Sequence, residues 1–590
     1  MGSAVFAAWG VDSFESRWQL LLRHANLKFL SIGIINMFCD RDFVFATITA
    51  LPSADSNERF FPGCRLRKKG TTSWAPWVWF IGTIVLAASV LFYRLGASPL
   101  EHFDESRLAN NALEMAKTGL SLITTYDGMP DHWNTKPPLL IWLMSISIQV
   151  FGPNEWAVRL PSALAALATV TLMFAFCNFR LQRPFAGFAA VVVLLGSYNY
   201  MHFHAARSGD YDATLALWTT GYVLAGYLYM HDDPSKRRQW LWLCAVGIVL
   251  AFLTKTVEGL IFLPALLIYA VAQNRIVEVL HSPAAYVSGA IVLLVCVGYY
   301  FWREQIDPGY FAAVMRNDLL NRYMTDGGGG PFFFYFLSLI VKSLLFAGFQ
   351  FQWGRGERRQ ISVFLGLMSL FFLVIISLSQ TKRGWYTVPL LPPSAMVIGI
   401  GLDQVLEWMT MRGRRIIING ALVSFCVFAS LCVMGQNARF VTINEEVLSN
   451  DERNLTSMFL RDPVVQYRSP QKFVVFQEGF PRSQTHLGDP SSFYVAPTLF
   501  YVNALRATGH TIEILPPSAS IPAGFNAAVM CGAMVPHAAT AQTGLTPLLI
   551  AGKCGIYQLG HQLKSDITPN AEATIPSDRL EPPIAGSLRE

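Results

Sequence analysis

Charged side chains suited to chemistry on a lipid phosphate occur in three short segments of this sequence. The segments are 103–105 (FDE), 136–139 (KPPL) and 207–212 (RSGDYD). Each places ionisable groups beside an apolar stretch, where a charge is costly and therefore a candidate for function. Carboxylates can act as general bases, and cations can hold a phosphate. The combination favours an enzyme over a pore.

The composition defines the class of protein that carries these segments. Of 590 residues, 53% are hydrophobic and 14% are charged, whereas a soluble protein has about a quarter charged. Apolar stretches of about 20 residues, long enough to span hydrocarbon, recur between Trp74 and Val433. The sequence therefore predicts a polytopic α-helical membrane protein. The net charge of +6 does not indicate nucleic-acid binding, because the basic residues cluster at helix ends.

We predict eleven spans in this region. They are 74–93, 160–178, 185–203, 211–230, 240–254, 257–273, 284–302, 332–350, 361–379, 386–402 and 416–435. The apolar segment 138–151 is short for a span, and we place it at the membrane interface. With that placement the positively charged loops fall on the cytoplasmic side, as the topology rule requires; they include 65–69, 180–183, 236–238, 355–359 and 412–415.

The outer side then receives the loops 95–159 and 303–331, the short turns 204–210 and 380–385, and the turn Thr254–Thr256. Several basic residues lie there against the topological preference: Arg207, Lys255, Arg303, Arg316, Arg322, Lys382 and Arg383. Each one alone is explained by pairing with lipid headgroups at the interface. Their position on the same side as the acidic segments favours a shared site.

The first outer loop has an internal order of its own. Asp104 can cap an amphipathic helix that runs to Thr118 and stops at Gly119, and such a helix would lie in the interface. A second helix is predicted to follow the proline pair at 137–138 and to end at 152–153. Lys136 then lies beside a helix N-terminus, where free backbone N–H groups favour phosphate.

These motifs resemble a known family. The runs FDESRLANNALEMAKTG and KPPLLIWLMSISIQVFGPNEWAVRLPSALAAL resemble bacterial GT-C membrane glycosyltransferases, the relatives of protein O-mannosyltransferases and of the lipid A aminoarabinose transferase. AARSGDYDA matches the Arg-x-Gly-x-x-Asp-Ala signature of the family at Arg207, Gly209 and Asp212. FLTKTVEGLIFLP matches at Lys255, with Thr256 where Gly is usual, and SLSQTKRGWYTVPLLPP matches at Lys382 and Tyr386. The resemblance covers about 74–435.

The resemblance implies transfer of a sugar from a polyprenyl-phosphate carrier to an acceptor on the outer face of a bacterial plasma membrane. The acceptor would be lipid A, another glycolipid, a polysaccharide or a protein. The implied catalytic carboxylates are Asp104, as the general base, with Glu105 and Asp212. The implied ligands of the carrier phosphate are Lys136, Arg207, Lys255, Arg322, Lys382 and Tyr386.

No cofactor is certain, and a divalent metal is one option. Relatives of the aminoarabinose type often have Glu before KPP and His before the loop Arg, but this chain has Thr135 and Leu319, which weakens a metal site built from that pair. Asp318 and Arg322 keep an acid-to-base spacing of four. A site at 202–204 (HFH) with nearby carboxylates is an alternative, although such histidines are commonly boundary residues.

Two polar turns have simpler interpretations. We expect Asp210 to be a solvated turn residue. Gly327–Gly330 does not indicate a phosphate-binding loop, because no strand precedes it and no Lys-Ser/Thr follows it, and we expect it to be a flexible hinge in the 303–331 loop. A transporter or flippase is the competing class, but it would typically show internal repeats with interrupted helices, which we do not find. A lipid-binding assembly factor without chemistry is the third interpretation.

The composition becomes that of a soluble module beyond the last span. We divide the chain into a cytoplasmic segment 1–73 of unassigned role, the transferase domain 74–436, an outer α/β module 437–562 and a disordered tail 563–590. Predicted strands are Phe473–Gln477, Thr511–Leu515, Asn526–Cys531 and Gly555–Leu559, with helical periodicity over Phe493–Thr508. Cys531 and Cys554 are the only two of nine cysteines in this module, and an oxidising compartment permits them to pair.

Overall fold

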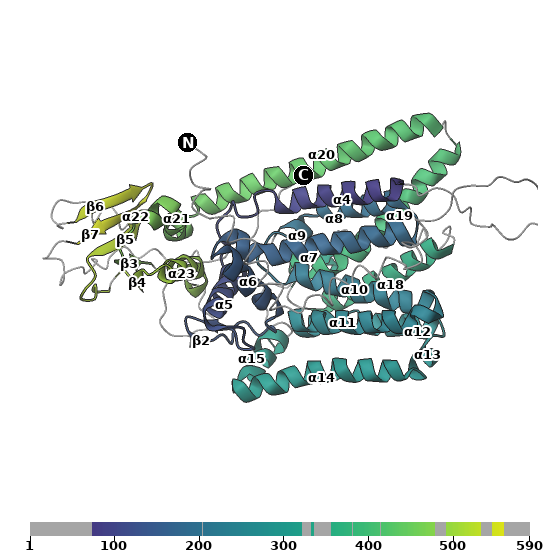
Figure 1. Cartoon of the computed structure of the whole chain (residues 1–590), viewed down its shortest axis with the longest axis horizontal. Coiled ribbons are helices and arrows are strands. Elements are labelled where there is room, and N and C mark those ends of the chain that lie inside the picture. The colour runs from purple at the N-terminus through teal and green to yellow at the C-terminus, as the bar shows by residue number, and fades with distance from the viewer. Residues whose placement is uncertain are drawn as a thin grey trace, which may run out of the picture. The chain divides into compact units, whose positions relative to one another are not determined.

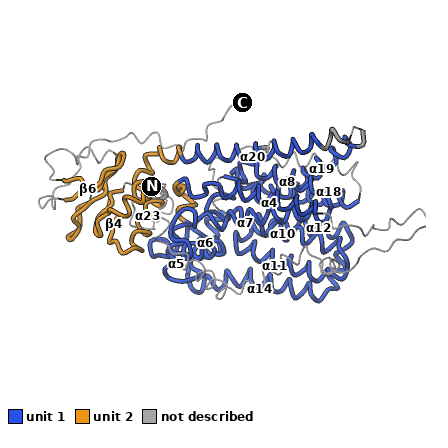
Figure 2. Tube along the Cα trace, turned by 45° about the horizontal axis from the view of Figure 1, so that its top comes forward, with its two compact units in different colours: residues 1–98, 108–445 blue, residues 99–107, 446–590 orange. Residues whose placement is uncertain are grey.

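The computed structural model describes residues 74–202, 204–320, 332–335, 356–379, 382–412, 415–477, 491–517, 519–532 and 545–559. The chain divides into two compact units (Figure 2). Unit 1 comprises residues 1–98 and 108–445, and unit 2 comprises residues 99–107 and 446–590. Unit 2 therefore combines the start of the first outer loop with the C-terminal module.

Long apolar helices build unit 1 (Figure 1). Its main α-helices are α4 (Ala75–Phe92), α7 (Glu155–Ala175), α10 (Asp212–His231), α11 (Arg237–Lys255), α14 (Pro283–Ile306), α18 (Gly356–Leu378) and α19 (Leu391–Arg412), and α20 (Arg415–Asn450) begins in it. Within the described residues, seven helical stretches are long and apolar enough to cross a membrane: Ala75–Phe92, Glu155–Arg180, Pro234–Leu260, Pro283–Ile306, Gly356–Leu378, Gly384–Thr410 and Gly420–Asn450. The multi-spanning class is confirmed, whereas the number eleven stays a prediction.

Some predicted spans have a different form in the structure. The segment 185–203 divides into α8 (Pro184–Leu195) and the single turn α9 (Tyr198–Met201). The segment 257–273 becomes a 3₁₀ turn followed by the short helix α12 (Leu263–Ala272). By contrast, α20 has 36 residues, or about 54 Å at 1.5 Å per residue, which exceeds a hydrocarbon core of about 30 Å. The predicted span 332–350 lies mostly outside the described residues.

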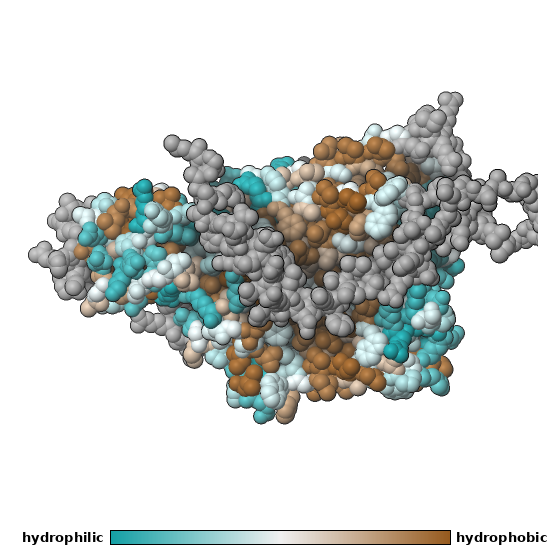
Figure 3. All heavy atoms as spheres, in the orientation of Figure 1, coloured by the Kyte–Doolittle hydropathy of each residue, from teal (hydrophilic) through white to brown (hydrophobic). Residues whose placement is uncertain are grey.

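The core of unit 1 is formed by closely packed central helices. Helix α8 packs on α19, and α10 packs on both α7 and α11. A methyl group at Gly399 would collide with the carbonyl oxygen of Ala186, so glycine permits the close approach of α8 and α19, as small residues do in membrane proteins. On α4 and α14 many large apolar side chains are exposed, and Figure 3 shows hydrophobic residues gathered over these helices. Such surfaces suit contact with lipid.

Two short helices of the predicted first outer loop begin and end where the sequence predicts. Helix α5 covers Asp104–Thr118, and Gly119 stops it with a φ of +98°, a conformation that favours glycine. Helix α6 covers Leu139–Phe151, and its 13 residues span only about 20 Å. That length is short for a hydrocarbon core, which supports the interfacial placement; the placement itself stays a prediction.

Unit 2 contains a five-stranded sheet of order β4-β3-β5-β7-β6. The strands are β3 (Lys472–Phe476), β4 (Thr511–Leu515), β5 (Ala527–Cys531), β6 (Thr546–Ala551) and β7 (Cys554–Gln558). Strand β3 is parallel to β4 and β5, while β7 is antiparallel to β5 and β6. The helices are α21 (Leu455–Arg461), α22 (Pro463–Arg468) and α23 (Ser491–Ala507). Four strands and α23 confirm the predicted α/β module.

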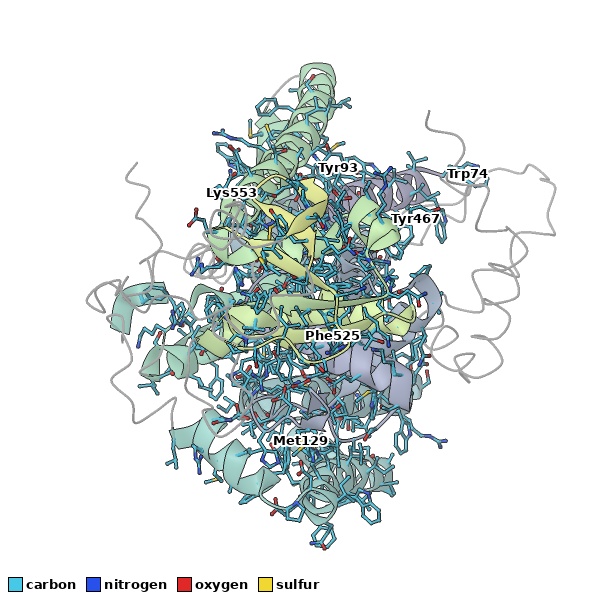
Figure 4. The ribbon with its side chains drawn as sticks, turned by 90° about the vertical axis from the view of Figure 1, so that its left-hand side faces the viewer. Trp74, Tyr93, Met129, Tyr467, Phe525 and Lys553 are labelled. Atoms are coloured by element: carbon cyan, nitrogen blue, oxygen red, sulfur yellow. A yellow bond between two sulfur atoms is a disulfide. The ribbon has the colours of Figure 1, made fainter. Side chains whose placement is uncertain are left out.

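The fifth strand and the disulfide complete this sheet. The edge strand β6 is not among the predicted strands, and in the structure its residues are mostly exposed. Cys531 and Cys554 are directly opposite in the β5–β7 ladder and form a disulfide, with 4.1 Å between their Cα atoms; the predicted pairing is confirmed. Figure 4 labels Phe525, which packs against the apolar side of the sheet, and Lys553 in the β6–β7 turn. Lys553 pairs with Glu452 at 3.0 Å.

Candidate active site

Lys136 and Asp318 form an ion pair in unit 1 although 182 residues separate them in the chain. Asp318 belongs to a π-helical turn over Met315–Leu320, and Lys136 lies just before α6. The Thr135 hydroxyl donates a 2.8 Å hydrogen bond to the other carboxylate oxygen of Asp318. The residues at positions 135 and 319 do not fit a metal ion. The Thr135 hydroxyl already donates to Asp318, and the Leu319 side chain has no atom that can bind a metal. The structure instead joins the two predicted outer loops through an ion pair.

A chain of buried hydrogen bonds fixes the segment that carries Lys136. The Tyr211 hydroxyl donates to Asn134 Oδ1 at 3.0 Å, and the Asn134 amide donates to Asn111 Oδ1 at 2.9 Å. The Asn111 amide donates to Asp131 Oδ2 at 3.1 Å. The backbone N–H of Trp133 also donates to Asp131, at 3.1 Å, which forms an Asx turn. These asparagines were missed from sequence, because nothing local indicates that their amides meet.

A second buried ion pair joins the start of α10 to the end of α11. Lys255 Nζ lies 2.6 Å from Asp212 Oδ1 and 3.1 Å from Glu258 Oε2. Asp212 is 2% exposed and Lys255 is 7% exposed. Among the described residues, Asp212 Oδ2 has no hydrogen-bond partner. The structure thus brings together two residues that were predicted for different roles, and it adds Glu258, which was not predicted.

The turn after Lys255 has an unusual backbone. Thr256 has φ +49° and ψ −126°, a conformation that L-residues with a β-branch rarely adopt. The family signature that this segment resembles has glycine where this chain has Thr256, and glycine adopts positive φ without strain. The sharp turn at Thr256 directs the chain into the 3₁₀ turn that carries Glu258.

Asp210 is buried, so the predicted solvated turn residue is wrong. The carboxylate is 5% exposed; it pairs with His204 Nδ1 and accepts a 2.6 Å hydrogen bond from the Tyr211 N–H. Burial alone raises the pKa of Asp210, but the charge and hydrogen bond of His204 and the charge of Lys255 together hold it below its usual value. The turn is buried because these partners replace solvent.

The two histidines at 202–204 contact different groups. The His202 ring stacks on Phe440 with 3.3 Å between centroids, whereas the His204 ring lies 4.3 Å from the Trp385 ring. His204 also has φ +58°, which is uncommon for a residue other than glycine. The His202 ring is therefore held by Phe440 and the His204 ring by Trp385. These contacts do not test a metal site that uses both histidines, and that site stays a prediction.

Arg207 caps helix α4. Its guanidinium donates to the carbonyl oxygens of Val90, Leu91 and Tyr93 at 3.0, 2.7 and 2.7 Å. Burial, followed by the charge of Arg159, lowers the pKa of Arg207 to about 10. Cations at a helix C-terminus satisfy free carbonyl groups. Arg207 therefore has a structural role that we did not predict, and its role as a phosphate ligand stays a prediction.

The remaining predicted phosphate ligands are placed in part. Lys382 Nζ donates to the Ser379 carbonyl at 2.6 Å. Tyr386 is half-buried in a 3₁₀ turn over Gly384–Leu390. Arg322 and the hinge predicted at Gly327–Gly330 lie outside the described residues. The structure therefore places Lys382 and Tyr386 near the start of α19, but it does not test their binding to phosphate.

Asp104 and Glu105 are the first two residues of α5, and both belong to unit 2. Glu105 is 2% exposed, and its carboxylate accepts a 2.8 Å hydrogen bond from the Glu101 N–H. Acidic residues in a first helical turn stabilise the helix. Glu105 thus contributes to local structure, while Asp104 is only partly buried. The catalytic role of each stays a prediction.

A buried polar network that sequence reasoning missed lies at the C-terminal end of α14. Arg303 is 1% exposed and pairs with Asp307, which lies 3.0 Å from His132 Nε2. The Arg303 guanidinium is 4.5 Å from the centre of the Tyr310 ring, and the Tyr310 hydroxyl donates to the Thr135 carbonyl at 2.7 Å. The sequence predicts Arg303 only as an outer basic residue. Asp307 and Tyr310 are close to it in the chain, but they in turn contact the distant residues His132 and Thr135.

Comparison with known proteins identifies relatives of this chain. The family described as dolichyl-phosphate-mannose-protein mannosyltransferase matches residues 135–302. An undecaprenyl phosphate-alpha-4-amino-4-deoxy-L-arabinose arabinosyl transferase of Pseudomonas savastanoi pv. phaseolicola is 27% identical over 390 residues, covering 63% of this chain and 70% of the relative. The protein of that name from Pseudomonas aeruginosa is 28% identical over 372 residues, covering 59% and 65%. This chain spans 58% to 70% of the length of such relatives.

Solved structures have the same fold. ArnT from Cupriavidus metallidurans bound to undecaprenyl phosphate aligns with a TM-score of 0.58 at 15% identity, covering 84% of this chain and 100% of that protein. Its apo structure aligns with a TM-score of 0.56 at 16% identity, covering 82% and 98%. The two relatives described above carry transferase names, and the predicted transporter alternative finds no support in them. The chain is a membrane glycosyltransferase of the GT-C fold, related to the protein O-mannosyltransferases and the aminoarabinose transferases.

Proposed function

We propose that this enzyme transfers a sugar from a polyprenyl-phosphate-linked donor to an acceptor on the outer face of a bacterial plasma membrane. The observation that carries the proposal is Lys136, placed beside the N-terminus of α6. There, an ammonium and the free N–H groups of a helix start favour the same anion. The choice of a polyprenyl-phosphate donor is supported by a solved structure of the same fold, that of ArnT bound to undecaprenyl phosphate.

The donor phosphate would be held mainly by Lys136. Lys255 is a weaker candidate than the sequence predicts, because Asp212 and Glu258 already neutralise its charge. Arg322, Lys382 and Tyr386 remain proposed ligands. A cation aimed at the phosphate stabilises the charge that grows on it as the sugar leaves.

Asp104 is the proposed general base for the acceptor. A carboxylate can remove a proton from an incoming hydroxyl or phosphate within hydrogen-bond reach. Asp212, whose second carboxylate oxygen lacks a partner among the described residues, is proposed to orient the sugar. Glu105 is proposed to support Asp104 by holding the first turn of α5.

The test is transfer by purified protein in micelles, with a polyprenyl-phosphate sugar as donor. Asp104→Asn should reduce the rate by a factor on the order of 10² to 10⁴ with unchanged folding. Asp127→Asn is the matched control, because Asp127 is an exposed acid of the same outer loop and asparagine tolerates its φ of +54°. Near-normal turnover in Asp104→Asn would exclude it as the base.

The sugar and the acceptor require a cellular experiment. The acceptor classes that we propose are lipid A, another glycolipid, a polysaccharide or a protein. Mass spectrometry of envelope lipids and glycans, with and without the gene, should reveal the product that disappears. If no glycan or lipid changes while the protein is expressed, transfer to an envelope acceptor is excluded.

The proposed orientation can be tested separately. Cysteines introduced at 236–238 should react only with reagents in the cytoplasm, and cysteines at 207–210 only with reagents outside. The reverse pattern would mean that α6 crosses the membrane instead of lying at its surface, and the proposed outer site would then face the wrong compartment.

A further inference from the structure

We propose that Asp318 is an internal anion that occupies Lys136 in the empty enzyme and exchanges with the phosphate of the lipid substrate. The inference rests on the proposed function, because it assumes that Lys136 binds the phosphate. It assigns to Asp318 control over how tightly the enzyme holds that phosphate, and in particular over release of the phosphate product.

The geometry gives the Asp318 carboxylate the position that a phosphate would take. One oxygen pairs with Lys136 Nζ and the other accepts the 2.8 Å hydrogen bond from Thr135 Oγ1. Lys136 Nζ is also 3.4 Å from Thr135 Oγ1. A phosphate that approached Lys136 would meet a carboxylate of like charge, and such a contact is unfavourable. Phosphate binding therefore requires Asp318 to move away from Lys136.

Asp318 can move without releasing the chain that carries it. Three other contacts join the same two segments: His132 lies 3.0 Å from Asp307, the Asn317 amide donates to the His132 carbonyl at 3.0 Å, and Tyr310 donates to the Thr135 carbonyl at 2.7 Å. These contacts do not use the Asp318 side chain. A rotation of that side chain is therefore enough to expose the ammonium.

The exchange has its greatest effect on the product. A sugar-linked donor has a phosphodiester with one negative charge, whereas the released carrier has a phosphate monoester with about −1.5 to −2 charges at pH 7. Lys136 alone would bind the more highly charged product more tightly than the donor. Return of Asp318 to Lys136 replaces this interaction and favours dissociation of the carrier phosphate.

The decisive variant is Asp318→Asn, which removes the charge but keeps an oxygen that can accept from Thr135. We measure the Kd of a polyprenyl phosphate for the full chain in detergent micelles. Loss of the competing charge should lower this Kd roughly tenfold, and the polyprenyl phosphate should inhibit transfer more strongly. An unchanged or higher Kd would overturn the inference. Asp318→Ser, which also removes the charge, provides the same readout if the asparagine variant does not fold.

Matched variants separate this exchange from general electrostatics. Glu304→Gln removes a negative charge from the same outer region, where Glu304 accepts from the Gly309 and Phe311 N–H groups, and should leave the Kd unchanged. In a Lys136→Ala background, Asp318→Asn should have no effect, since a double-mutant cycle reports coupling between the two side chains. The exchange would be contradicted if Glu304→Gln lowered the Kd as much as Asp318→Asn does. It would also be contradicted if Asp318→Asn lowered the Kd by the same factor in the Lys136→Ala background.

The same experiment distinguishes failure of the inference from failure of the proposed function. If Lys136→Ala binds the polyprenyl phosphate as well as the parent, Lys136 is not the phosphate ligand and the donor site proposed above is wrong. If Lys136→Ala weakens binding but neither Asp318 variant tightens it, the donor site stands and only the exchange is excluded.

Discussion

Lys255 at the end of α11 donates a 2.6 Å hydrogen bond to Asp212 at the start of α10, and both side chains are buried. The pair joins two neighbouring helices where a charge without a partner would be costly. The sequence motifs predict a functional role for both residues, whereas their contact indicates that they stabilise the packing of α10 against α11. The two roles make different predictions.

Removal of one partner should be more harmful to folding than removal of both. Asp212→Asn should destabilise unit 1 by about 3 kcal/mol, because the buried Lys255 loses its contact with a charged carboxylate 2.6 Å away, whereas Asp212→Leu with Lys255→Met should recover much of that loss. Thermal unfolding in detergent measures both. If the double variant is folded yet inactive, the pair also acts in catalysis; if it regains activity, its role is structural.

The strained turn at Thr256 predicts a benefit from glycine. Thr256→Gly and Thr256→Ala both remove the hydroxyl and the β-branch of the side chain. Only the glycine variant relieves the positive φ, and it should be more stable than the alanine variant by about 1 kcal/mol. The melting temperatures of the two variants provide the comparison. Equal stability would mean that the turn does not strain the backbone.

His102 predicts a loss of stability in acid within unit 2. Burial, only partly offset by Asp451, lowers the pKa of His102 to about 4, from 6.5 for an exposed histidine. The unfolded chain therefore binds a proton that the folded chain does not, between about pH 6.5 and 4. Stability should be complete above pH 6.5 and should fall by up to about 3 kcal/mol as the pH decreases toward 4.

Calorimetry of the full chain at several pH values tests this prediction, with His102→Gln as the comparison. Glutamine cannot titrate, so the variant should lose less stability than the parent between pH 6.5 and 4. Parallel pH profiles for the two proteins would assign the acid sensitivity to other groups.

The disulfide should stabilise unit 2 by closing a long loop. Cys531 and Cys554 are 23 positions apart, and the chain-entropy model gives about 3 kcal/mol for a loop of this length. Cys531→Ser with Cys554→Ser should therefore increase proteolysis of unit 2 under mild urea. Cys432→Ser, which removes an exposed free thiol of α20, is the control and should have little effect. Equal proteolysis of both variants would show that the bond contributes nothing measurable.

The sequence by itself determined the class of protein and many of its local elements. Composition and the recurring apolar stretches identified a multi-spanning membrane protein, because stretches of about 20 apolar residues are long enough to span the hydrocarbon of a bilayer. The bounds of α5 followed from Asp104 and Gly119, since capping and helix termination depend on neighbouring residues. The four strands followed from short local patterns within one small module, whereas the sequence only permitted Cys531 and Cys554 to pair, and the structure places them opposite each other in one ladder.

Only the tertiary structure decided which charged side chains meet. Asp318 pairs with Lys136 across 182 positions, Arg207 caps α4 instead of facing solvent, and Asp210 is buried against His204. The break in the predicted span 185–203 and the length of α20 were likewise not evident from sequence. Local preferences cannot specify such features, because desolvation and ion pairing depend on how distant helices pack, and packing is decided by the whole chain.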